Sequence, residues 1–401
     1  MNPVFTEEPS TLVVTCSGGI APYLSQELES LGFRPGCATE TSVETEGTLA
    51  DCMRLNLHLR TAHRVLYTLD RFRARNAGQL YANLVEIPWE RYLDANGYFS
   101  VDRAVDNPTI LDTQYAALKV KDAVVDRMRA ACGRRPDSGN IRDEACLFLH
   151  WADNAASIYI DTTGESLNFR GYRAASSAAP IRESLAAALV MATGWDGRGN
   201  FLNPMCGGGT IAIEALWMAQ RRAPALKREN FAFMHLACFE PTAWTQLRSE
   251  AVREFERHKD VACKIVASDI DPEMIDATRE NLALAGGAEH VECAVGDITI
   301  SPVPETAERG VILLNPPYGG RMGDPVRLRN TYLDIGGFLE AHADAYDGFV
   351  FTGNPDLAED AGLTAADRET FYSGKIECKL LKNPRLSPEA LAQFRRRDAR
   401  R

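Results

Sequence analysis

The sequence predicts an α/β protein in which a parallel-sheet domain follows a smaller α+β half. Two observations carry this prediction. From about residue 199 onward, short apolar strands alternate with helices, a rhythm typical of a parallel sheet covered by helices. Before residue 169, β-branched strands alternate with isolated helices and end in two strands joined by a tight polar turn. The chain has 401 residues, enough for about two to three domains.

The first 54 residues are predicted to form a small α+β unit. A strand at 11–16 is followed by a glycine pair and then by a helix at 21–31. Leucines of this helix recur three and four residues apart, so they share one face. Short strands near 39–43 complete the unit.

Residues 55–168 are predicted to form a second α+β domain. Its expected elements are strands at 65–70, 98–104, 145–150 and 156–161 and helices at 78–86 and 113–131. The last two strands pair across Asp153-Asn154, residue types that favour tight turns.

Residues 169–386 are predicted to form the parallel-sheet domain, beginning with a small, polar linker at 169–179. Its expected strands are 199–202, 264–267, 291–294, 311–314 and 348–352, followed by an edge hairpin of 370–372 and 376–381. A helix at 211–220 follows the first strand, and a helical insertion is expected at about 221–262. Residues 387–401 form a basic C-terminal tail.

The net charge of −11, with an isoelectric point near 5.3, argues at first against a nucleic-acid partner. The charge is segregated, however. Segments 54–75, 119–135 and 382–401 carry +5, +4 and +5, so the rest of the chain carries −25. The local basic segments favour a polyanion that binds at one place.

The compartment is predicted to be the cytoplasm. The N-terminus lacks a basic stretch followed by an apolar one, and the longest apolar run, at about 185–192, is far short of the roughly 18 residues that span a bilayer. The ten cysteines include no C-x-x-C pair, and the seven histidines show no metal-ligand spacing. We therefore expect reduced thiols, no metal and no membrane association.

A glycine-rich turn is the first motif with chemical content. The stretch Asn203-Pro-Met-Cys-Gly-Gly-Gly-Thr210 lies between a predicted strand and a helix. Glycines there let the backbone approach a ligand closely and present the N–H groups of a helix N-terminus. By itself the turn fits a dinucleotide, a phosphate or S-adenosylmethionine, and the lysine of a P-loop is absent.

Two carboxylates follow the next strands. Asp269 stands at the tip of the second strand, where a carboxylate can accept hydrogen bonds from both ribose hydroxyls. Asp271, before Pro272, is interpreted as a helix N-cap. Asp297 follows the third strand, where its side chain can meet an adenine amino group.

The stretch Asn315-Pro316-Pro317-Tyr318-Gly319 follows the apolar strand 311–314. Two prolines give a stiff, extended backbone without N–H groups, so carbonyl oxygens are free to face a cleft. This suits a conjugated NH₂ group, whose two hydrogens the Asn315 oxygen and the Pro316 carbonyl can hold while its nitrogen attacks a methyl group. Tyr318 can stack on a flat substrate.

In this order the motifs resemble class I S-adenosylmethionine-dependent methyltransferases that act on planar NH₂ groups. The chain is most similar to THUMP-domain RNA methyltransferases, in particular bacterial enzymes that form N2-methylguanosine in 23S ribosomal RNA. Further stretches that carry the resemblance are Gln114-Tyr115, 119–126, 167–173, 179–185 and Arg222-Ala-Pro224, and it covers about residues 10–386. It implies a ferredoxin-like unit, a THUMP RNA-binding domain and a Rossmann-like seven-stranded methyltransferase domain that ends in an antiparallel hairpin.

The resemblance also implies roles for matching residues. The cofactor would be held by Asn203, Met205, Cys206, Gly207, Gly209, Thr210, Asp269 and Asp297, and the target base by Asn315, Pro316 and Tyr318. Structured RNA would contact Arg71, Arg73, Gln114, Lys119, Lys121, Arg170 and Arg173. No protein partner is implied.

Two departures from the family stand out. Asn203 replaces the acid that usually opens the glycine loop, so a charge near the cofactor's amino group is lost. The gap from Gly209 to Asp269 is 60 positions, against ~20 in a plain dinucleotide fold, and the insertion explains it. Relatives with a second C-terminal methyltransferase domain exist, but this chain ends at 401, so one reaction is expected.

Several other substrates and functions are compatible with these motifs. The Asn-Pro-Pro-Tyr motif serves N6 of adenine in RNA or DNA equally well, and transfer RNA is a further guanine substrate. A non-catalytic RNA-binding or assembly factor would keep a degenerate pocket, for which Asn203 is the only argument. A glutamine amide in a protein also fits the motif, but leaves the THUMP-like half without a purpose.

Overall fold

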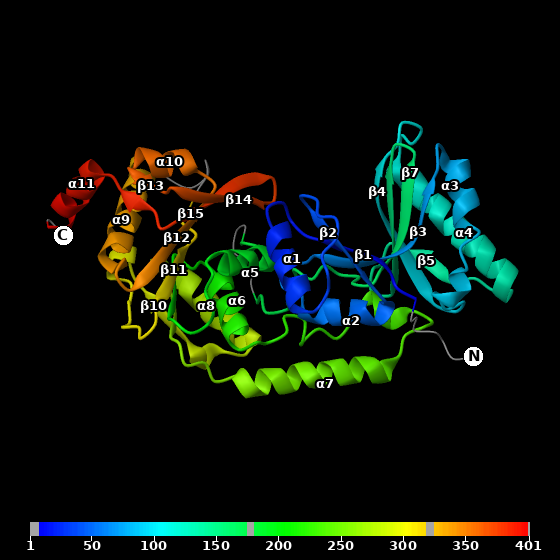
Figure 1. The fold of residues 1–401 in the computed structure, drawn as a ribbon, viewed down its shortest axis with the longest axis horizontal. Helices are drawn as coiled ribbons and strands as arrows, with labels where there is room; N and C mark the ends of the chain where they lie inside the picture. The colour runs from blue at the N-terminus through cyan, green and yellow to red at the C-terminus, as the bar shows by residue number, and fades with distance from the viewer. Residues whose placement is uncertain (1–7, 175–179, 318–324, 400–401) are drawn as a thin grey trace. The chain divides into compact units, whose positions relative to one another are not determined.

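The computed structural model describes residues 8–174, 180–317 and 325–399. The described chain forms two compact units. The first contains residues 8–16, 24–169 and 224–251, and the second contains 17–23, 170–223 and 252–399. Both units are built around a seven-stranded sheet (Figure 1).

The sheet of the first unit has the strand order β2-β1-β3-β7-β6-β4-β5. Its strands are β1 (Ser10–Thr15), β2 (Ser42–Gly47), β3 (Arg64–Arg73), β4 (Tyr98–Asp106), β5 (Asp137–Gly139), β6 (Ala145–Ala152) and β7 (Ala155–Asp161). Strand β3 pairs with β1 on one side and with β7 on the other. The two α+β domains expected from the sequence therefore share one continuous sheet.

The helices of this unit are α1 (Ala21–Ser30), α2 (Leu49–His58), α3 (Ala77–Leu84) and α4 (Thr113–Cys132), with α1 shared between the two units. Helix α2 was not predicted, although a capping box marks its start. Thr48 Oγ1 accepts from the Asp51 N–H at 3.2 Å, and Asp51 accepts from the Thr48 N–H at 2.8 Å. The strand expected near 39–43 begins only at Ser42.

The imidazole of His58, at the end of α2, is predicted to make the unit less stable in acid. Burial and the charges of Arg54 and Arg60 lower the pKa of His58 to about 4, against a weaker opposite effect of Glu250. Its unfolded pKa is about 6.5, so folding favours the neutral ring. The stability is fully present above about pH 6.5 and falls as the pH drops toward 4.

We expect His58→Gln to reduce the loss of thermal stability between about pH 7 and pH 5, measured by circular dichroism on the whole chain. His150→Gln, which removes an exposed imidazole on β6, is the matched control. Equal pH dependence in the two variants would contradict the assignment.

The sheet of the second unit has the order β10-β9-β8-β11-β12-β15-β14. Its strands are β8 (Phe201–Pro204), β9 (Ile265–Asp269), β10 (Val291–Val295), β11 (Gly310–Leu314), β12 (Tyr346–Thr352), β14 (Asp367–Ser373) and β15 (Ile376–Lys382). The first five run parallel, and β15 pairs antiparallel with both β12 and β14. This is the seven-stranded, hairpin-terminated sheet that the resemblance implies.

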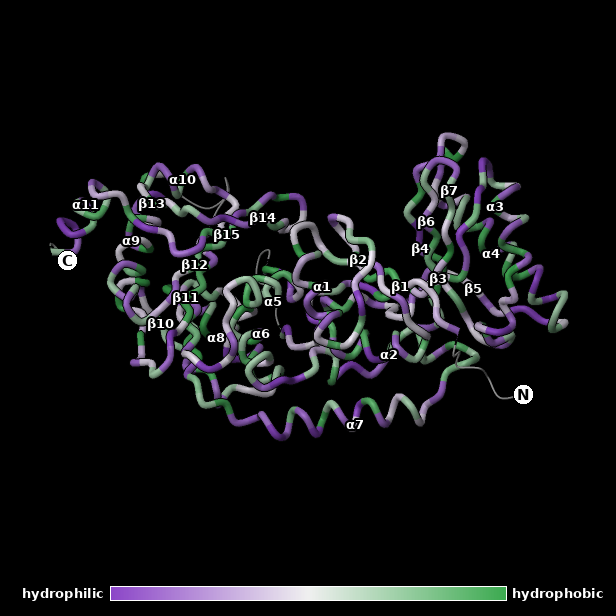
Figure 2. Tube along the Cα trace, in the orientation of Figure 1, coloured by the Kyte–Doolittle hydropathy of each residue, from purple (hydrophilic) through white to green (hydrophobic). Residues whose placement is uncertain are grey.

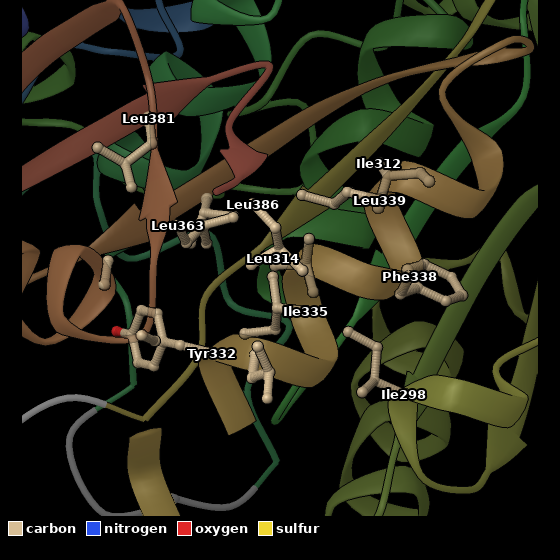
Figure 3. Packing of buried hydrophobic residues seen from close by; sticks show 14 of the residues in the cluster. Ile298, Ile312, Leu314, Tyr332, Ile335, Phe338, Leu339, Leu363, Leu381 and Leu386 are labelled. Atoms are coloured by element: carbon tan, nitrogen blue, oxygen red, sulfur yellow. The ribbon is translucent and has the colours of Figure 1, made fainter. Parts of the chain in front are cut away.

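The second unit also contains the helices α5 (Glu183–Ala192), α6 (Thr210–Ala219), α8 (Pro272–Ala285), α9 (Pro325–His342), α10 (Pro355–Asp360) and α11 (Pro388–Asp398). Asp271 caps α8 as expected, because its side chain accepts from the Glu273 N–H at 2.9 Å. Figure 3 shows Ile335 and Leu339 of α9 against Ile312 and Leu314 of β11, within the apolar core of this unit.

The segment expected as a basic tail contains helix α11. Phe394 packs against α9, where a Cβ on Gly337 would lie 2.3 Å from the Phe394 ring. Arg397 donates to Asn330 at 3.0 Å and pairs with Asp334 at 3.4 Å. Residues 388–398 are therefore part of the second unit.

The expected helical insertion contains α7 (Pro241–His258), of which only Trp244 and Ala251 are buried. Figure 2 shows hydrophilic residues along most of this helix. Residues 224–251 of the insertion belong to the first unit. Among the described residues, no helix combines the length and the apolar character needed to cross a bilayer.

Candidate functional site

The sequence motifs meet at the carboxyl ends of β8, β9, β10 and β11. Strand β8 lies between β9 and β11, so the chain order of the sheet reverses beside it. In open α/β sheets, ligands bind outside the carboxyl ends of the strands at such a switch point. The site therefore lies where the fold class expects it.

The glycine loop between β8 and α6 has a strained, left-handed course. Met205, Gly207 and Gly209 have φ angles of 57°, 53° and 77°. A Cβ on Gly209 would lie 2.6 Å from the Thr278 methyl group, whereas a Cβ on Gly207 would meet nothing within 4 Å. Gly209 is thus required for packing, and Gly207 borders open space that a ligand can fill.

Two side chains of helix α8 hold the glycine loop by donating hydrogen bonds to carbonyl groups of the loop. Thr278 Oγ1 donates to the Gly207 carbonyl at 2.7 Å, and Asn281 Nδ2 donates to the Gly208 carbonyl at 2.9 Å. With these carbonyls bound to α8, the N-terminus of α6 at Thr210 remains available to a ligand. Neither Thr278 nor Asn281 was singled out in the sequence, because neither belongs to a local motif.

Asp269 and Asp297 stand at the ends of β9 and β10. Asp269 Oδ2 accepts from the Gly207 N–H at 2.9 Å, and its Oδ1 accepts from the Asp271 N–H at 3.0 Å. Asp297 Oδ1 accepts from the Thr299 N–H and hydroxyl at 3.1 and 2.8 Å. Both carboxylates are held in place by their neighbours, and each retains free lone pairs for a ligand.

Two asparagine oxygens mark the switch point itself. Asn203 is fully buried, and its Nδ2 donates to the Leu313 carbonyl of β11 at 2.8 Å. The Oδ1 atoms of Asn203 and Asn315 are buried and have no hydrogen-bond partner among the described residues. A buried acceptor without a partner costs about 1–3 kcal/mol, so both oxygens are suited to donors on a ligand.

These residues fit S-adenosylmethionine, the cofactor that the resemblance implies. The open side of Gly207, the carboxylates at two successive strand ends and the orphaned Asn203 oxygen match a ligand with an ammonium group, ribose hydroxyls and an adenine amine. Burial raises the pKa of Cys206 to about 12. This loop thiol therefore stays protonated at neutral pH and is not a nucleophile.

The remaining predicted base-binding residues follow β11. Pro316 is buried and Pro317 is exposed, in a segment without regular secondary structure. Tyr318 lies outside the described residues. Within the described residues, no group of three histidine, cysteine or acidic side chains lies where it could hold one metal ion, and all ten cysteines are free thiols.

The predicted RNA-binding residues of the first unit differ in how far protein carboxylates neutralise them. Arg71 pairs with Glu44 at 2.6 Å, and Lys119 pairs with Asp122 at 2.8 Å. Gln114 and Lys121 line a hollow of about 330 Å³ between β4 and α4, where Arg103, Asn140 and Arg142 join them. Arg73 forms no ion pair with a described carboxylate.

The two predicted RNA-binding residues of the second unit serve its own packing. The Arg170 side chain is 1% exposed and pairs with Glu214 at 3.4 Å. This burial argues against the direct RNA contact that we predicted for Arg170. Arg173 pairs with Glu183 at 2.7 Å and donates to the Ile181 carbonyl, so it holds the segment before α5.

Three family descriptions match successive parts of the chain. Residues 11–66 match the RlmL ferredoxin-like domain, 74–161 match the THUMP domain, and 170–382 match the RMKL-like methyltransferase domain.

Curated relatives named ribosomal RNA large subunit methyltransferase K/L are similar over nearly all of the chain. The protein of Pseudomonas paraeruginosa is 36% identical over 377 residues, which are 92% of this chain and 52% of the relative. That of Syntrophotalea carbinolica is 36% identical over 383 residues, 94% of this chain and 53% of the relative. The chain spans about half the length of these relatives.

Solved structures share the whole fold. SMU.472, described as a methyltransferase and crystallised with SAH, superposes with a TM-score of 0.86 at 26% identity, covering 95% of this chain and all of that one. A protein of Clostridium difficile 630 described as a methylase gives 0.83 at 28%, covering 95% and 99%. A protein of Listeria monocytogenes described as an N6-adenine-specific DNA methylase gives 0.82 at 29%, covering 94% and 96%.

Proposed function

Because the chain belongs to the family of RMKL-like methyltransferase domains, we propose that it methylates the exocyclic N2 of a guanine in 23S ribosomal RNA, with S-adenosylmethionine as the methyl donor. The observation that carries this proposal is the buried Asn315 oxygen at the switch point, which has no hydrogen-bond partner among the described residues. This oxygen is a hydrogen-bond acceptor at the place where the amino group of the guanine would have to be held.

The cofactor supplies a methyl group on a positively charged sulfur, which is already reactive toward nucleophiles. The residues of this chain therefore act by positioning and by electrostatics. The Asn315 Oδ1 and the Pro316 carbonyl accept one hydrogen each from the guanine amino group. Because both hydrogens are held to one side, the nitrogen becomes pyramidal and its lone pair is released from conjugation. Tyr318 is proposed to stack on the flat base.

The cofactor would be held by three elements of the same edge. The Asp269 carboxylate accepts from the ribose hydroxyls, and Asp297 accepts from the adenine amine. The loop from Met205 to Thr210 surrounds the methionine part, and the Asn203 oxygen accepts from its ammonium group. Asn203 stands where the family usually has an acid, and its side-chain oxygen is still an acceptor for the ammonium group. Its Nδ2 also donates a hydrogen bond to the Leu313 carbonyl. The substitution therefore does not by itself argue for a non-catalytic protein.

Two observations favour large-subunit ribosomal RNA over DNA or a protein as the substrate. The relatives named as large-subunit ribosomal RNA methyltransferases are 36% identical to this chain, and the Listeria protein described as an adenine-specific DNA methylase is 29% identical. The THUMP match at 74–161 supports an RNA substrate rather than DNA or a protein glutamine. A ribosomal substrate implies a cytoplasmic enzyme, in line with the compartment that the cysteine pattern predicts.

Contact with the RNA is proposed for the THUMP-containing unit. Arg73, Gln114 and Lys121 have side chains free of carboxylate partners among the described residues, so they are the first candidates. Arg71 and Lys119 are held by Glu44 and Asp122, and they would add to phosphate attraction only weakly.

Methyl transfer from radiolabelled S-adenosylmethionine tests the proposal. The purified chain is incubated separately with unmodified 23S ribosomal RNA, 16S ribosomal RNA, transfer RNA and duplex DNA. We expect incorporation into 23S ribosomal RNA alone. Incorporation only into transfer RNA or DNA would reject the substrate, and failure to bind the cofactor in calorimetry would support a non-catalytic binding factor.

A further inference from the structure

A hollow of about 330 Å³ lies in the first unit between β4 and α4. Its wall includes Arg103, Gln114, Leu118, Lys121, Asn140 and Arg142. Its volume is within the range of small-ligand sites, about 300–1,000 Å³. All of these residues belong to the THUMP-containing unit.

Two cations of this hollow are not neutralised by Asp102, the carboxylate that also lines it, because Asp102 pairs with Arg142 instead. Arg103 Nε donates to the Thr113 hydroxyl at 3.3 Å, and Lys121 Nζ donates to the Gly139 carbonyl at 2.9 Å. Neither forms an ion pair with a described carboxylate. Burial and the charge of Arg103 both lower the pKa of Lys121, so the two cations are close enough to repel each other. An anion between them would relieve this repulsion.

The loop after β5 is held against the side chain of Tyr98 on β4. Tyr98 Oη accepts from the Ile141 N–H at 3.0 Å, and a Cβ on Gly139 would lie 2.4 Å from the same oxygen. Arg142 pairs with Asp102 and, at 2.9 Å, with Asp161. Arg142 is therefore neutralised and forms a fixed wall, in contrast to Arg103 and Lys121.

The hollow also offers polar and apolar surface of the kind that recognises a base. The side chains of Gln114 and Asn140 make no hydrogen bond with a described residue. Carboxamides of this type read the edges of unpaired bases. Leu118, which lines the hollow, is 54% exposed. Its apolar side chain provides a face on which a flat ring can lie.

We propose that this hollow binds one unpaired nucleotide of the RNA substrate, with its phosphate between Arg103 and Lys121 and its base against Leu118, Gln114 and Asn140. The inference rests on the proposed function, which it deepens. A base stacked and paired in a duplex cannot enter the hollow, so the site selects RNA with a single-stranded nucleotide. This nucleotide is distinct from the methylated guanine, which is held at Asn315 in the other unit.

Fluorescence anisotropy with the whole chain tests this site. The probes are a fluorescein-labelled stem–loop RNA with an unpaired loop and a blunt duplex of the same stem. We expect Arg103→Gln and Lys121→Gln each to weaken stem–loop binding roughly tenfold and to lower its dependence on salt. Gln114→Leu, which keeps the charge, should reduce the preference for the stem–loop over the duplex.

Arg134→Gln is the matched control, because it removes an exposed charge that forms no ion pair with a described carboxylate and lies outside the hollow. It should leave the preference for the stem–loop unchanged. Unchanged calorimetric affinity for S-adenosylmethionine and unchanged thermal unfolding show that the variants are folded.

The outcomes separate the two proposals. If the wild-type chain binds the stem–loop and the hollow variants bind it equally well, the nucleotide site is wrong and the proposed function stands. Equal losses for the stem–loop and the duplex would also reject the site, because they indicate phosphate attraction alone. If the wild-type chain binds no RNA, both proposals fail.

Discussion

Asn315→Ala is expected to bind S-adenosylmethionine nearly as tightly as the wild type and to methylate RNA roughly a hundredfold to a thousandfold more slowly. The Asn315 oxygen is buried without a partner among the described residues, and we propose that it accepts from the target amino group. The alanine variant leaves one hydrogen of the amino group unheld, and the nitrogen lone pair stays conjugated with the ring. Calorimetry with the cofactor and single-turnover methyl transfer measure the two effects separately.

Asn315→Asp provides the control for this prediction. The aspartate keeps the size of the side chain and its acceptor oxygen but removes the amide N–H groups. Because the target amine needs acceptors, we expect Asn315→Asp to retain clearly more activity than Asn315→Ala. Unchanged turnover in the alanine variant would contradict the assigned role, and equal loss in both variants would show that the acceptor is not what matters.

Asp269→Ala is expected to weaken the binding of S-adenosylmethionine by roughly a hundredfold or more. The Asp269 carboxylate fixes the glycine loop through the Gly207 N–H at 2.9 Å, and it is proposed to accept from the ribose hydroxyls. The substitution therefore removes a direct ligand contact and the support of the loop. Calorimetric titration with S-adenosylmethionine gives the dissociation constant.

Asp271→Ala is the matched control, because Asp271 lies two residues further along and caps α8. Loss of this N-cap should cost about 1 kcal/mol of stability without a comparable change in cofactor affinity. If Asp269→Ala binds the cofactor like the wild type, or if both variants lose affinity equally, the ribose contact is wrong.

The fold of the second unit was predictable because its strands are short apolar runs with clear breaks between them. All seven strands of its main sheet, with the hairpin around Ser373-Gly374, lie where the sequence placed them to within a few residues. The predicted elements of the first unit also agree with the observed ones to within a few residues, but two elements of this unit were not predicted. Helix α2 and strand β5 were missed, because α2 has an Asn at its buried face and β5 is only three residues long.

The local parts of the site were predictable, and the parts that depend on the tertiary fold were not. The glycine loop and Asp269 form a sequence signature, and the structure brings them together through the Gly207–Asp269 hydrogen bond. Thr278 and Asn281 hold the loop from α8, about seventy positions away, and no local pattern announces them. For the same reason the burial of Arg170 against Glu214 could not be read from its basic neighbourhood.

Which basic side chains are paired with carboxylates could be learned only from the structure. The sequence separates three basic segments from an acidic background, but it does not tell which cations are neutralised. Arg71 and Lys119 face carboxylates, whereas Arg103 and Lys121 do not. Arg103 lies outside the basic segments. Only the packing of α4 against β4 places its side chain in the same hollow as Lys121.

Mass spectrometry of nucleosides from purified 23S ribosomal RNA tests the proposed guanine-N2 methylation most directly. RNA is compared between the wild type, a deletion strain, and the deletion strain complemented with this chain or with its Asn315→Ala variant. We expect the amount of N2-methylguanosine to fall in the deletion strain and to be restored only by the unsubstituted chain. Loss of N6-methyladenosine with N2-methylguanosine unchanged would contradict the guanine assignment.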